Sequence, residues 1–235
     1  MTREQQLCNG ISPWLSPVAM VITQDLVLRR FFRGVTVLDS HNLPHSGPLL
    51  LAPTHRTRWD SLLLPHAAGR RVSGRDCRFM VTIDEMRGLQ GWLLRRLGCF
   101  AVDQTRPSLL SLRYAVDLLQ QGQQLVVFPE GRIKRDHQTP IRLQQGLARL
   151  ALLARSQGVN VPVLPVGLAY QHRPARWRDR AAVCFGAPLT AGGRGRDGAQ
   201  AFSRELAQAM ETCERRACAA IGARAALAGA PDRSP

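Results

Sequence analysis

The chain of 235 residues is long enough for one globular domain with flanking segments, and its 45% of hydrophobic residues can fill a core. Lys and Arg number 32 against 17 Asp and Glu, and the formal charge of +15 favours anionic partners such as nucleic acid, lipid headgroups or phosphorylated substrates. The six cysteines form no C-x-x-C pair, so no zinc or disulfide framework is expected. No apolar run reaches the roughly 20 residues of a spanning helix, so any membrane contact would be interfacial.

The first predicted element is an apolar helix with a basic end, residues 14–33, and the residues before it lack the pattern of a secretory signal. Its apolar side chains begin at Trp14, Gln24 and Asp25 interrupt them, and three arginines close the segment. Such a segment either packs into the core or lies in a membrane interface. We expect residues 1–34 to attach the protein to the anionic, cytoplasmic face of a membrane.

From residue 35 onward, short apolar runs alternate with longer stretches of helical periodicity. The runs predicted as strands are Val35–Leu38, Pro48–Ala52, Phe79–Ile83, Phe100–Val102, Leu125–Phe128, Val161–Val166 and Ala181–Phe185. The stretches predicted as helices are Trp59–Ala68, Asp84–Leu97, Pro107–Gln121 and Ile141–Gln157. Such alternation is typical of α/β domains. Residues 35–190 are therefore predicted to form a single α/β domain with a mixed, mostly parallel sheet flanked by helices.

The C-terminal region, residues 191–235, begins with the glycine-rich run A-G-G-R-G-R-D-G (191–198). This run lacks the lysine and the spacing of a phosphate-binding loop and is predicted to be a linker. A helix follows, with apolar residues at helical spacing from Phe202 to Ile221 and charged residues on its other face. We expect this helix to dock on the domain and the last dozen residues to be disordered.

The first chemical motif is A-P-T-H-R-T-R-W-D, residues 52–60, which follows a predicted strand. On a straight helix, His55 and Asp60 would point about 140° apart and would not share a face. They can meet if His55 lies on the loop leaving the strand and Asp60 in the first turn of the next helix. The carboxylate would then orient the imidazole, although a hydrogen-bonded histidine beside a helix-capping aspartate would give the same spacing.

Two further predicted strands end in polar residues. In L-V-V-F-P-E-G-R-I-K-R (125–135) a strand ends at Phe128, a proline stops the ladder, and Gly131 permits a tight turn with exposed amides. Three cations follow within four residues: Arg132, Lys134 and Arg135. They suit an anion, or are simply solvated. The run G-C-F-A-V-D-Q-T-R (98–106) also ends in an arginine. Ligands of open α/β sheets gather at the carboxyl ends of strands, so these units predict one site there.

With these runs in this order, the sequence resembles the glycerolipid acyltransferases, specifically the 1-acylglycerol-3-phosphate acyltransferases. The segments that carry the resemblance are His55-x4-Asp60, Gly98-x-Phe100-x-Val102-Asp103, Phe128-Pro-Glu-Gly131 and Val161-Pro-Val-Leu-Pro-Val166. They occur in family order over roughly residues 35–170. The resemblance implies an enzyme that moves a fatty acyl group from an acyl thioester, acyl-CoA or acyl-carrier-protein, to the free hydroxyl of 1-acylglycerol-3-phosphate and gives phosphatidate.

The resemblance also assigns roles to residues. His55 is implied as the general base and Asp60 as the group that orients it, and direct attack by the acceptor is expected because the chain has no G-x-S-x-G elbow. The residues implied in substrate binding are Phe128, Pro129, Glu130, Gly131, Gly98 and Asp103. Amides around Gly131 or after His55 are candidates for an oxyanion hole. No cofactor and no metal site are expected.

Two positions depart from the family pattern and leave the acceptor open. The family usually has arginines in its second and third motifs where this chain has Gln104 and Ile133. Cations near enough in sequence to bind a phosphate instead are Arg132, Arg135 and Arg106. Lys134 is expected to be solvated. The alternatives are a different lipid or hydroxylated acceptor, or a non-catalytic basic module for a lipid surface or nucleic acid; the scattered arginines, without a nucleic-acid-binding motif, argue against nucleic acid.

Overall fold

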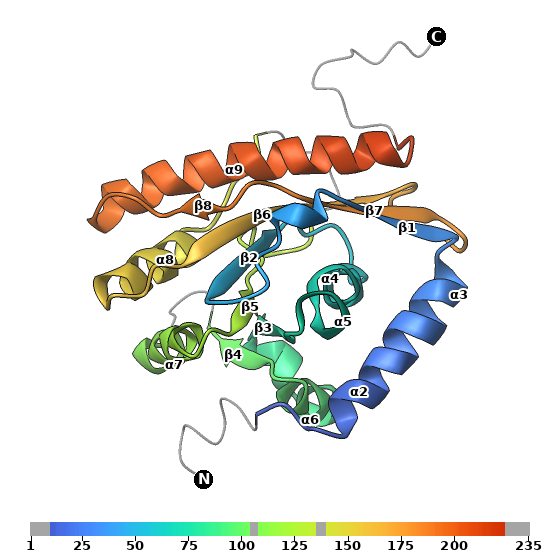
Figure 1. Ribbon diagram of the computed structural model, residues 1–235, viewed down its shortest axis with the longest axis horizontal. Helices are drawn as coiled ribbons and strands as arrows, with labels where there is room; N and C mark the ends of the chain where they lie inside the picture. The colour runs from blue at the N-terminus through green and yellow to red at the C-terminus, as the bar shows by residue number, and fades with distance from the viewer. Residues whose placement is uncertain (1–9, 104–107, 135–139, 224–235) are drawn as a thin grey trace.

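A mixed β-sheet runs through the middle of the molecule, whose computed structural model describes residues 10–103, 108–134 and 140–223 (Figure 1). Within these residues the strands are β1 (Gly34–Leu38), β2 (Leu49–Pro53), β3 (Cys77–Thr82), β4 (Phe100–Val102), β5 (Gln124–Val126), β6 (Pro162–Tyr170), β7 (Arg180–Phe185) and β8 (Leu189–Thr190). Their order is β1-β7-β6-β2-β5-β3-β4, and β8 pairs with β6. All neighbours from β6 to β4 are parallel, whereas β7 and β8 are antiparallel to β6. The predicted mixed, mostly parallel sheet is confirmed.

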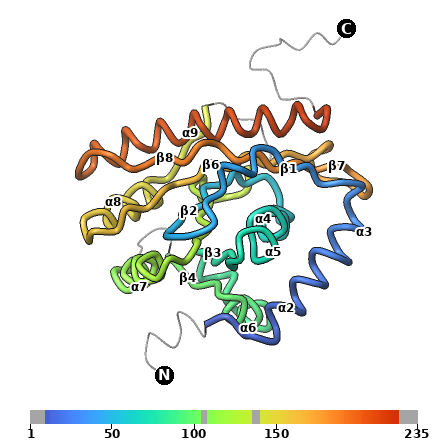
Figure 2. The backbone as a smooth tube through the Cα atoms, in the orientation of Figure 1, coloured from blue at the N-terminus to red at the C-terminus, as the bar shows by residue number. Residues whose placement is uncertain are grey.

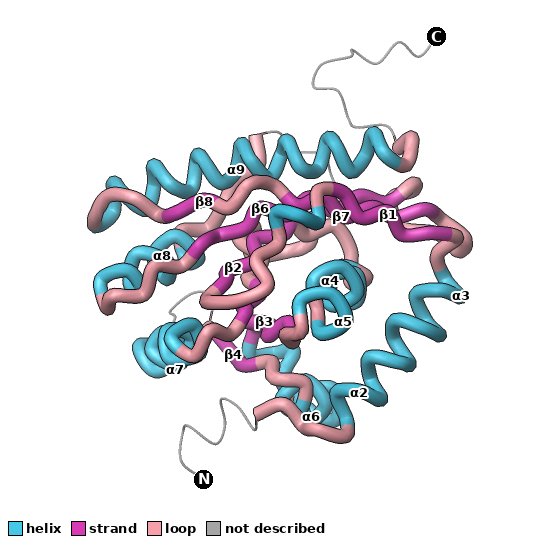
Figure 3. The backbone as a smooth tube through the Cα atoms, in the orientation of Figure 1, coloured by secondary structure: helices cyan, strands magenta, loops and turns pink. Residues whose placement is uncertain are grey.

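Helices cover both faces of this sheet and give the domain three layers (Figure 3). They are α2 (Leu15–Met20), α3 (Arg29–Phe31), α4 (Asp60–Ala68), α5 (Arg70–Ser73), α6 (Gly88–Arg96), α7 (Leu109–Gln120), α8 (Gly146–Ser156) and α9 (Gly195–Ala220). A π-helical stretch, Val21–Leu28, joins α2 to α3, and 3-10 turns occupy Ser40–Asn42 and Ile83–Met86. The core on one face joins α7, α8 and α9, and the core on the other joins α4 and the end of the N-terminal helix.

Strand β2 is apolar throughout because it lies between these two layers. Leu50 and Ala52 belong to the core with α7, α8 and α9, whereas Leu49 and Leu51 belong to the core with α4. The strand has parallel neighbours on both sides, β5 and β6. A continuous apolar run is typical of a strand buried on both faces. Because β2 is the fourth strand in the order of seven, its carboxyl end lies near the middle of the sheet. The His55 motif follows directly after this end.

Some element boundaries differ from the sequence prediction. The predicted helix Asp84–Leu97 is divided, because Arg87 has an extended backbone between the 3-10 turn and α6. Helix α8 begins only at Gly146. The residues before it run along the F-P-E-G segment, where the N–H of Gln144 donates to the carbonyl of Pro129 at 2.7 Å. This contact with a distant segment, which local periodicity does not reveal, replaces the first predicted turn of the helix.

The glycine-rich run predicted to be a linker is instead a close-packed turn that leads into α9. The helix begins at Gly195, inside the run 191–198. A Cβ at Gly198 would lie 2.9 Å from the backbone of Gly193, whose φ of +75° is in the left-handed region. The glycines here permit a tight approach of two backbone segments, so they do not mark a flexible connection. The C-terminal tail expected to be disordered begins at residue 224, outside the described residues.

The N-terminal helix, residues 15–31, is attached to the domain by two polar side chains and by the buried Leu28, and it exposes several of its other apolar side chains. Gln24 is buried and donates to the carbonyl of Pro65 at 3.2 Å, and Asp25 accepts two bonds from Arg71, at 2.7 and 2.6 Å. The exposed apolar side chains are Trp14, Val18, Val21, Ile22 and Leu26. The residues that interrupt the apolar pattern thus help to hold the helix. Among the described helices, none combines the length and the apolarity needed to cross a membrane.

The two ends of this helix contact different parts of the domain (Figure 2). At its start, the N–H of Ser12 donates to the carbonyl of Arg96 at 2.8 Å, which places it beside α6. At its end, the ring of Phe31 stacks on Trp59, with centroids 4.0 Å apart. Trp59 directly precedes Asp60. The N-terminal helix therefore extends from α6 to the loop that contains the His55 motif.

Candidate active site

The loop that follows β2 holds His55 and is fastened to the neighbouring strand β6. Thr54 donates its backbone N–H to the carbonyl of Val166 at 2.9 Å, and its hydroxyl accepts the N–H of Leu168 at 2.9 Å. Asp60 begins α4, so the two side chains belong to a strand-loop-helix turn, as the spacing predicted. His55 Nδ1 lies 2.8 Å from Asp60 Oδ2. The pair therefore meets, which a continuous helix would not allow.

Asp60 is a buried carboxylate with several donors besides His55. Its Oδ2 accepts the N–H groups of Arg56 at 2.6 Å and Thr57 at 3.0 Å, and its Oδ1 accepts the hydroxyl of Tyr170 at 2.5 Å. An ionised carboxylate only accepts hydrogen bonds, so the His55 Nδ1 donates, and Nε2 is left as the acceptor. An imidazole held in this tautomer can take a proton from a hydroxyl group.

Tyr170 is a residue of this site that sequence reasoning missed. It ends β6, four positions beyond the predicted end of that strand at Val166. Val166, Leu168 and Tyr170 share the core with α4, so continuing the period-two pattern of the strand would have placed the tyrosine on this face. Burial, with the charge of Asp60, raises the pKa of Tyr170 well above its usual range. The phenol therefore stays protonated and keeps donating.

The F-P-E-G segment supports His55 from a neighbouring strand. The ring of Phe128 stacks on the imidazole, with centroids 3.9 Å apart and planes at 23°. Gly131 has a φ of +73°, and its N–H donates to the carbonyl of Phe128 at 3.1 Å, which closes the expected tight turn. Further along, the N–H of Lys134 donates to the carbonyl of His55 at 2.8 Å. The segment therefore fixes both the ring and the backbone of His55.

Glu130 points into the protein. Its Oε1 accepts the N–H of His55 at 3.0 Å, and its two oxygens accept Arg56 Nη1 at 2.7 and 3.0 Å. The side chains of Glu130 and Arg56 are only 3% and 4% exposed. In this conformation Glu130 therefore holds the backbone of the His55 loop, and its expected role in substrate binding stays a prediction.

Arg56 is shared between two carboxylates. Glu214, on α9, accepts Arg56 Nε and Nη2, both at 2.6 Å, and also Arg173 Nη2 at 2.6 Å. Burial opposes the charged form of Arg56, but the bonds and charges of the two carboxylates outweigh it and raise the pKa of Arg56. Burial likewise opposes ionised Glu214, but its two arginines outweigh burial and lower the pKa of Glu214. Burial raises the pKa of Glu130, which shares Arg56 with Glu214.

Four of the backbone amides considered for an oxyanion hole are bonded within the protein. The N–H groups of residues 55–57 donate to the carboxylates described above, and that of Gly131 closes its own turn. An amide that already donates in a good geometry has no second hydrogen to offer. In this conformation these four amides are therefore not oxyanion donors.

The other expected substrate-binding residues lie in different places. Gly98 precedes β4, at the amino end of that strand, and a Cβ there would lie 2.7 Å from Ile11. Its position thus indicates a role in packing against Ile11, and the expected substrate contact stays a prediction. Asp103 follows β4 at the carboxyl edge of the sheet, and Arg132 is exposed in the turn after Gly131. Outside the described residues lie Arg106 and Arg135.

A second histidine–aspartate pair lies in the loop between β6 and β7. His172 Nδ1 is 2.7 Å from Asp179 Oδ1. The other oxygen of Asp179 accepts the N–H of Arg176 at 2.7 Å. A carboxylate that accepts nearby amides in this way closes a loop. This pair thus offers an internal comparison for the His55–Asp60 pair, with a local structural role.

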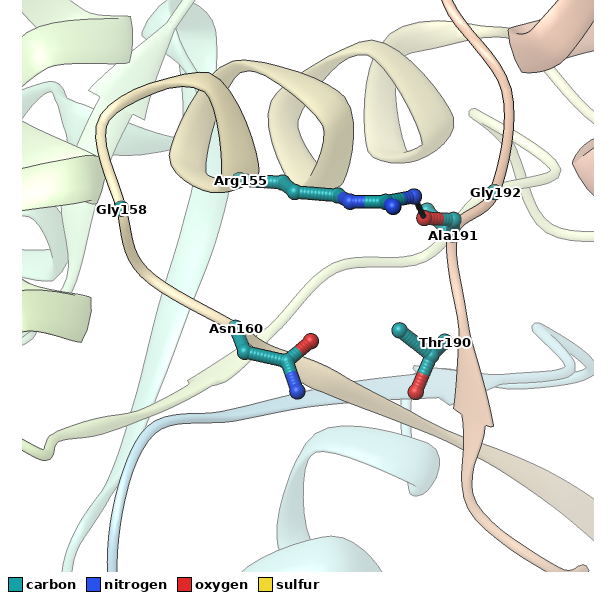
Figure 4. A pocket seen from close by; sticks show the side chains of 6 residues that line it. All are labelled: Arg155, Gly158, Asn160, Thr190, Ala191 and Gly192. Atoms are coloured by element: carbon teal, nitrogen blue, oxygen red, sulfur yellow. Dashed lines mark hydrogen bonds between the residues drawn. The ribbon is translucent and has the colours of Figure 1, made fainter.

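A pocket at the opposite edge of the sheet is separate from this site (Figure 4). Its lining residues are Arg155, Gly158, Asn160, Thr190, Ala191 and Gly192. Arg155 Nη1 donates to the carbonyl of Ala191 at 2.8 Å across it. The pocket adjoins the amino end of β6, whereas His55 follows the carboxyl end of the parallel strand β2.

Among the described side chains, no group of three or more His, Cys, Asp or Glu is arranged to hold a metal ion.

Comparisons with known proteins show similarity in sequence family and in fold. A family model described as Acyltransferase matches residues 34–169. Among solved structures, the crystal structure of the 1-acyl-sn-glycerophosphate (LPA) acyltransferase PlsC from Thermotoga maritima is similar, with a TM-score of 0.62 and 20% sequence identity. The match covers 89% of this chain and 81% of that chain, and at this identity it shows a shared fold. No curated protein matches the sequence.

Proposed function

Because the chain belongs to the acyltransferase family, we propose that it transfers a fatty acyl group from an acyl thioester to the free hydroxyl of 1-acylglycerol-3-phosphate and gives phosphatidate. The observation that carries this proposal is the His55–Asp60 pair, whose geometry leaves Nε2 as an acceptor at the carboxyl edge of the sheet. The name of the similar solved structure supports the acceptor, and so does the charge of +15, which favours a phosphorylated substrate.

In the proposed mechanism His55 is the general base. Its Nε2 takes the proton of the acceptor hydroxyl while the oxygen attacks the thioester carbonyl. The new C–O bond forms, the C–S bond breaks, and the leaving thiolate receives the proton from the imidazolium. Asp60 holds the tautomer and stabilises the imidazolium. The five described cysteines are buried, which fits direct attack by the acceptor rather than an acyl-enzyme on a thiol.

A phosphate on the acceptor requires cations near His55. Lys134 is bonded through its backbone to the His55 carbonyl, and Arg132 is exposed in the same turn. We place the acceptor phosphate beside these two residues, which flank the Ile133 found where the family usually has an arginine. Lys134 thus becomes a stronger candidate than the sequence suggested, because its backbone is fixed next to the proposed base.

Contact with an anionic membrane surface is the second part of the proposal. Apolar side chains are exposed on the N-terminal helix and on α6, which lies next to the start of the N-terminal helix (Figure 2). On α6, Leu89 is 81% and Trp92 is 42% exposed. Arginines end both helices. An apolar face of this kind can enter the headgroup region while arginines bind anionic lipids. Attachment to the cytosolic leaflet would bring the site close to lipid substrates.

Thioester release with varied acceptors tests the proposed function. The protein is given acyl-CoA or acyl-carrier-protein together with 1-acylglycerol-3-phosphate or its dephosphorylated counterpart. We expect thiol release to depend on the phosphorylated acceptor. Equal use of both acceptors would favour the alternative that Gln104 and Ile133 suggest, an acyltransferase for another lipid. No thiol release with either donor and any acceptor would refute acyl transfer.

A further inference from the structure

The C-terminal helix α9 reaches the His55 loop through one buried carboxylate. Glu214 accepts two of the three side-chain nitrogens of Arg56, and Glu130 accepts the third. Arg56 is therefore held from both sides, by α9 and by the F-P-E-G segment. A guanidinium group bound in this bidentate manner has a fixed plane as well as a fixed position.

We infer that Glu214 is a positioning residue for the proposed acyl transfer, acting on the His55–Asp60 pair through Arg56; the inference rests on the proposed function. Arg56 connects to both members of the pair. Its backbone N–H donates to Asp60 Oδ2 at 2.6 Å. Its Nη1 shares Glu130 Oε1 with the backbone N–H of His55. A shift of the guanidinium would therefore disturb the carboxylate that holds the backbone of His55. If the shift extends to the backbone of Arg56, it would also disturb the carboxylate that orients the imidazole.

The charges of this cluster make Glu214 necessary to the position of Arg56. The buried cluster contains two carboxylates and two guanidinium groups, so its charges balance. Its members are Glu130, Glu214, Arg56 and Arg173. A buried cation is tolerated only when it is paired, and removing one partner leaves the other uncompensated. Without the charge of Glu214, Arg56 would keep only Glu130 and Arg173 would lose its carboxylate partner, and we expect Arg56 to move.

The position of Glu214 is fixed by close packing of the α9 backbone on β6. A Cβ at Gly167 of β6 would lie 2.2 Å from the backbone nitrogen of Glu214 and 2.2 Å from the carbonyl carbon of Cys213. Helix α9 thus rests directly on β6 at the turn that carries the carboxylate. The same strand fastens Thr54, directly before His55, through two hydrogen bonds. The distance from α9 to the His55 loop is therefore set by one strand.

The test compares Glu214→Gln with Glu211→Gln, a matched control one turn earlier on α9. Glu211 also anchors the helix, because it accepts the N–H of Ile141 at 2.5 Å, but its partner lies outside the His55 loop. We expect Glu214→Gln to lower kcat about 10- to 100-fold, with the KM of donor and acceptor within about twofold of wild type. Glu211→Gln should keep kcat within about twofold.

Two further measurements separate positioning from a loss of folded protein. The low-field proton resonance of His55 Nδ1–H, assigned by its absence in His55→Gln, should shift or broaden in Glu214→Gln and stay unchanged in Glu211→Gln. Arg56→Lys keeps the charge but loses the planar fork, so it should lower kcat similarly, and the double variant with Glu214→Gln should be no worse than the single ones.

Any of three results for Glu214→Gln would overturn the inference. The first two are a wild-type kcat and an unchanged His55 resonance. The third is a loss of activity no larger than the fraction of unfolded protein measured by thermal unfolding. Failure of the proposed function has a different signature. In that case the wild type transfers no acyl group to any acceptor, while the resonance still reports whether Glu214 positions His55.

Discussion

Replacing Tyr170 with Phe removes one hydroxyl group and leaves the ring and its packing in place. This hydroxyl donates to Asp60 Oδ1 at 2.5 Å, whereas the Thr57 hydroxyl lies 3.5 Å from the same oxygen. Asp60 is 0% exposed, so bulk solvent does not replace the lost donor. A hydrogen bond to a charged group contributes about 1.5–3 kcal/mol, and we expect the free energy of unfolding to fall by about 2 kcal/mol.

Thermal unfolding and steady-state kinetics check this prediction separately. For a chain of this length, about 2 kcal/mol lowers the Tm by about 4–8 °C. We expect kcat to fall about tenfold, equivalent to about 1.4 kcal/mol, because Asp60 then holds the His55 tautomer less firmly. This loss is smaller than the free energy of the whole hydrogen bond, because Asp60 Oδ2 keeps its donors. The KM values should not change, because the variant removes no substrate contact.

The matched control is Tyr114→Phe. Tyr114 is the other tyrosine of the chain; it lies on α7, on the opposite face of the sheet, with its ring against Phe100 at 5.2 Å. This variant should keep the wild-type kcat. If Tyr170→Phe kept both the kcat and the Tm of the wild type, the bond to Asp60 would contribute to neither catalysis nor stability, and the reasoning would be refuted.

Other predictions concern the base, the membrane surface, the acceptor site and the ion cluster. His55→Ala should lower kcat by about 10²-fold or more, whereas His172→Ala, at the second histidine–aspartate pair, should leave it unchanged; equal losses would contradict the role of His55. Leu26→Asp should weaken flotation with anionic liposomes at low salt. If recovery of the wild type with liposomes depended on neither lipid charge nor salt, membrane binding through this surface would be excluded. Lys134→Gln should raise the acceptor KM with the phosphorylated lysolipid but not with its dephosphorylated counterpart; a change in both would exclude a phosphate contact. The pKa of Glu214 in the folded protein lies below its ordinary 4.5, so the ionised form stabilises the protein fully above that pH. The difference in unfolding free energy between the wild type and Glu214→Gln should therefore shrink as the pH falls through the pKa of Glu214 in the folded protein. A difference that stayed constant with pH would contradict the ion pairing.

The parts of the site that sequence predicts are those that local chain geometry decides. His55 and Asp60 are five residues apart across a strand-loop-helix turn, so an apolar run, a loop and a helix start are enough to bring them together. The turn at Gly131 depends in the same way on one residue that adopts a positive φ. Alternating strands and helices likewise predict a mostly parallel sheet, because a parallel neighbour requires a crossover connection.

The parts that sequence does not predict depend on contacts between distant residues. Tyr170 is 110 positions from Asp60, and Glu214 is 158 positions from Arg56. No periodicity within one element reveals such a pairing. Gln24 presents a different difficulty, because a polar residue in an apolar helix is usually assigned to the solvent face. Here it is buried against α4 while the nearby Ile22 and Leu26 are exposed, which reverses the usual rule at these positions.

Strand β6 explains why these distant residues meet at one site. On one face its end carries Tyr170, whose hydroxyl reaches Asp60. On the opposite face Gly167 lets α9 approach, which brings Glu214 to the His55 loop. Successive side chains of a strand alternate between faces, so a shift of one residue would exchange the two faces and remove both supports together. The family match ends at residue 169, before Tyr170 and α9, so these two supports lie beyond the matched segment although the pair itself lies within it.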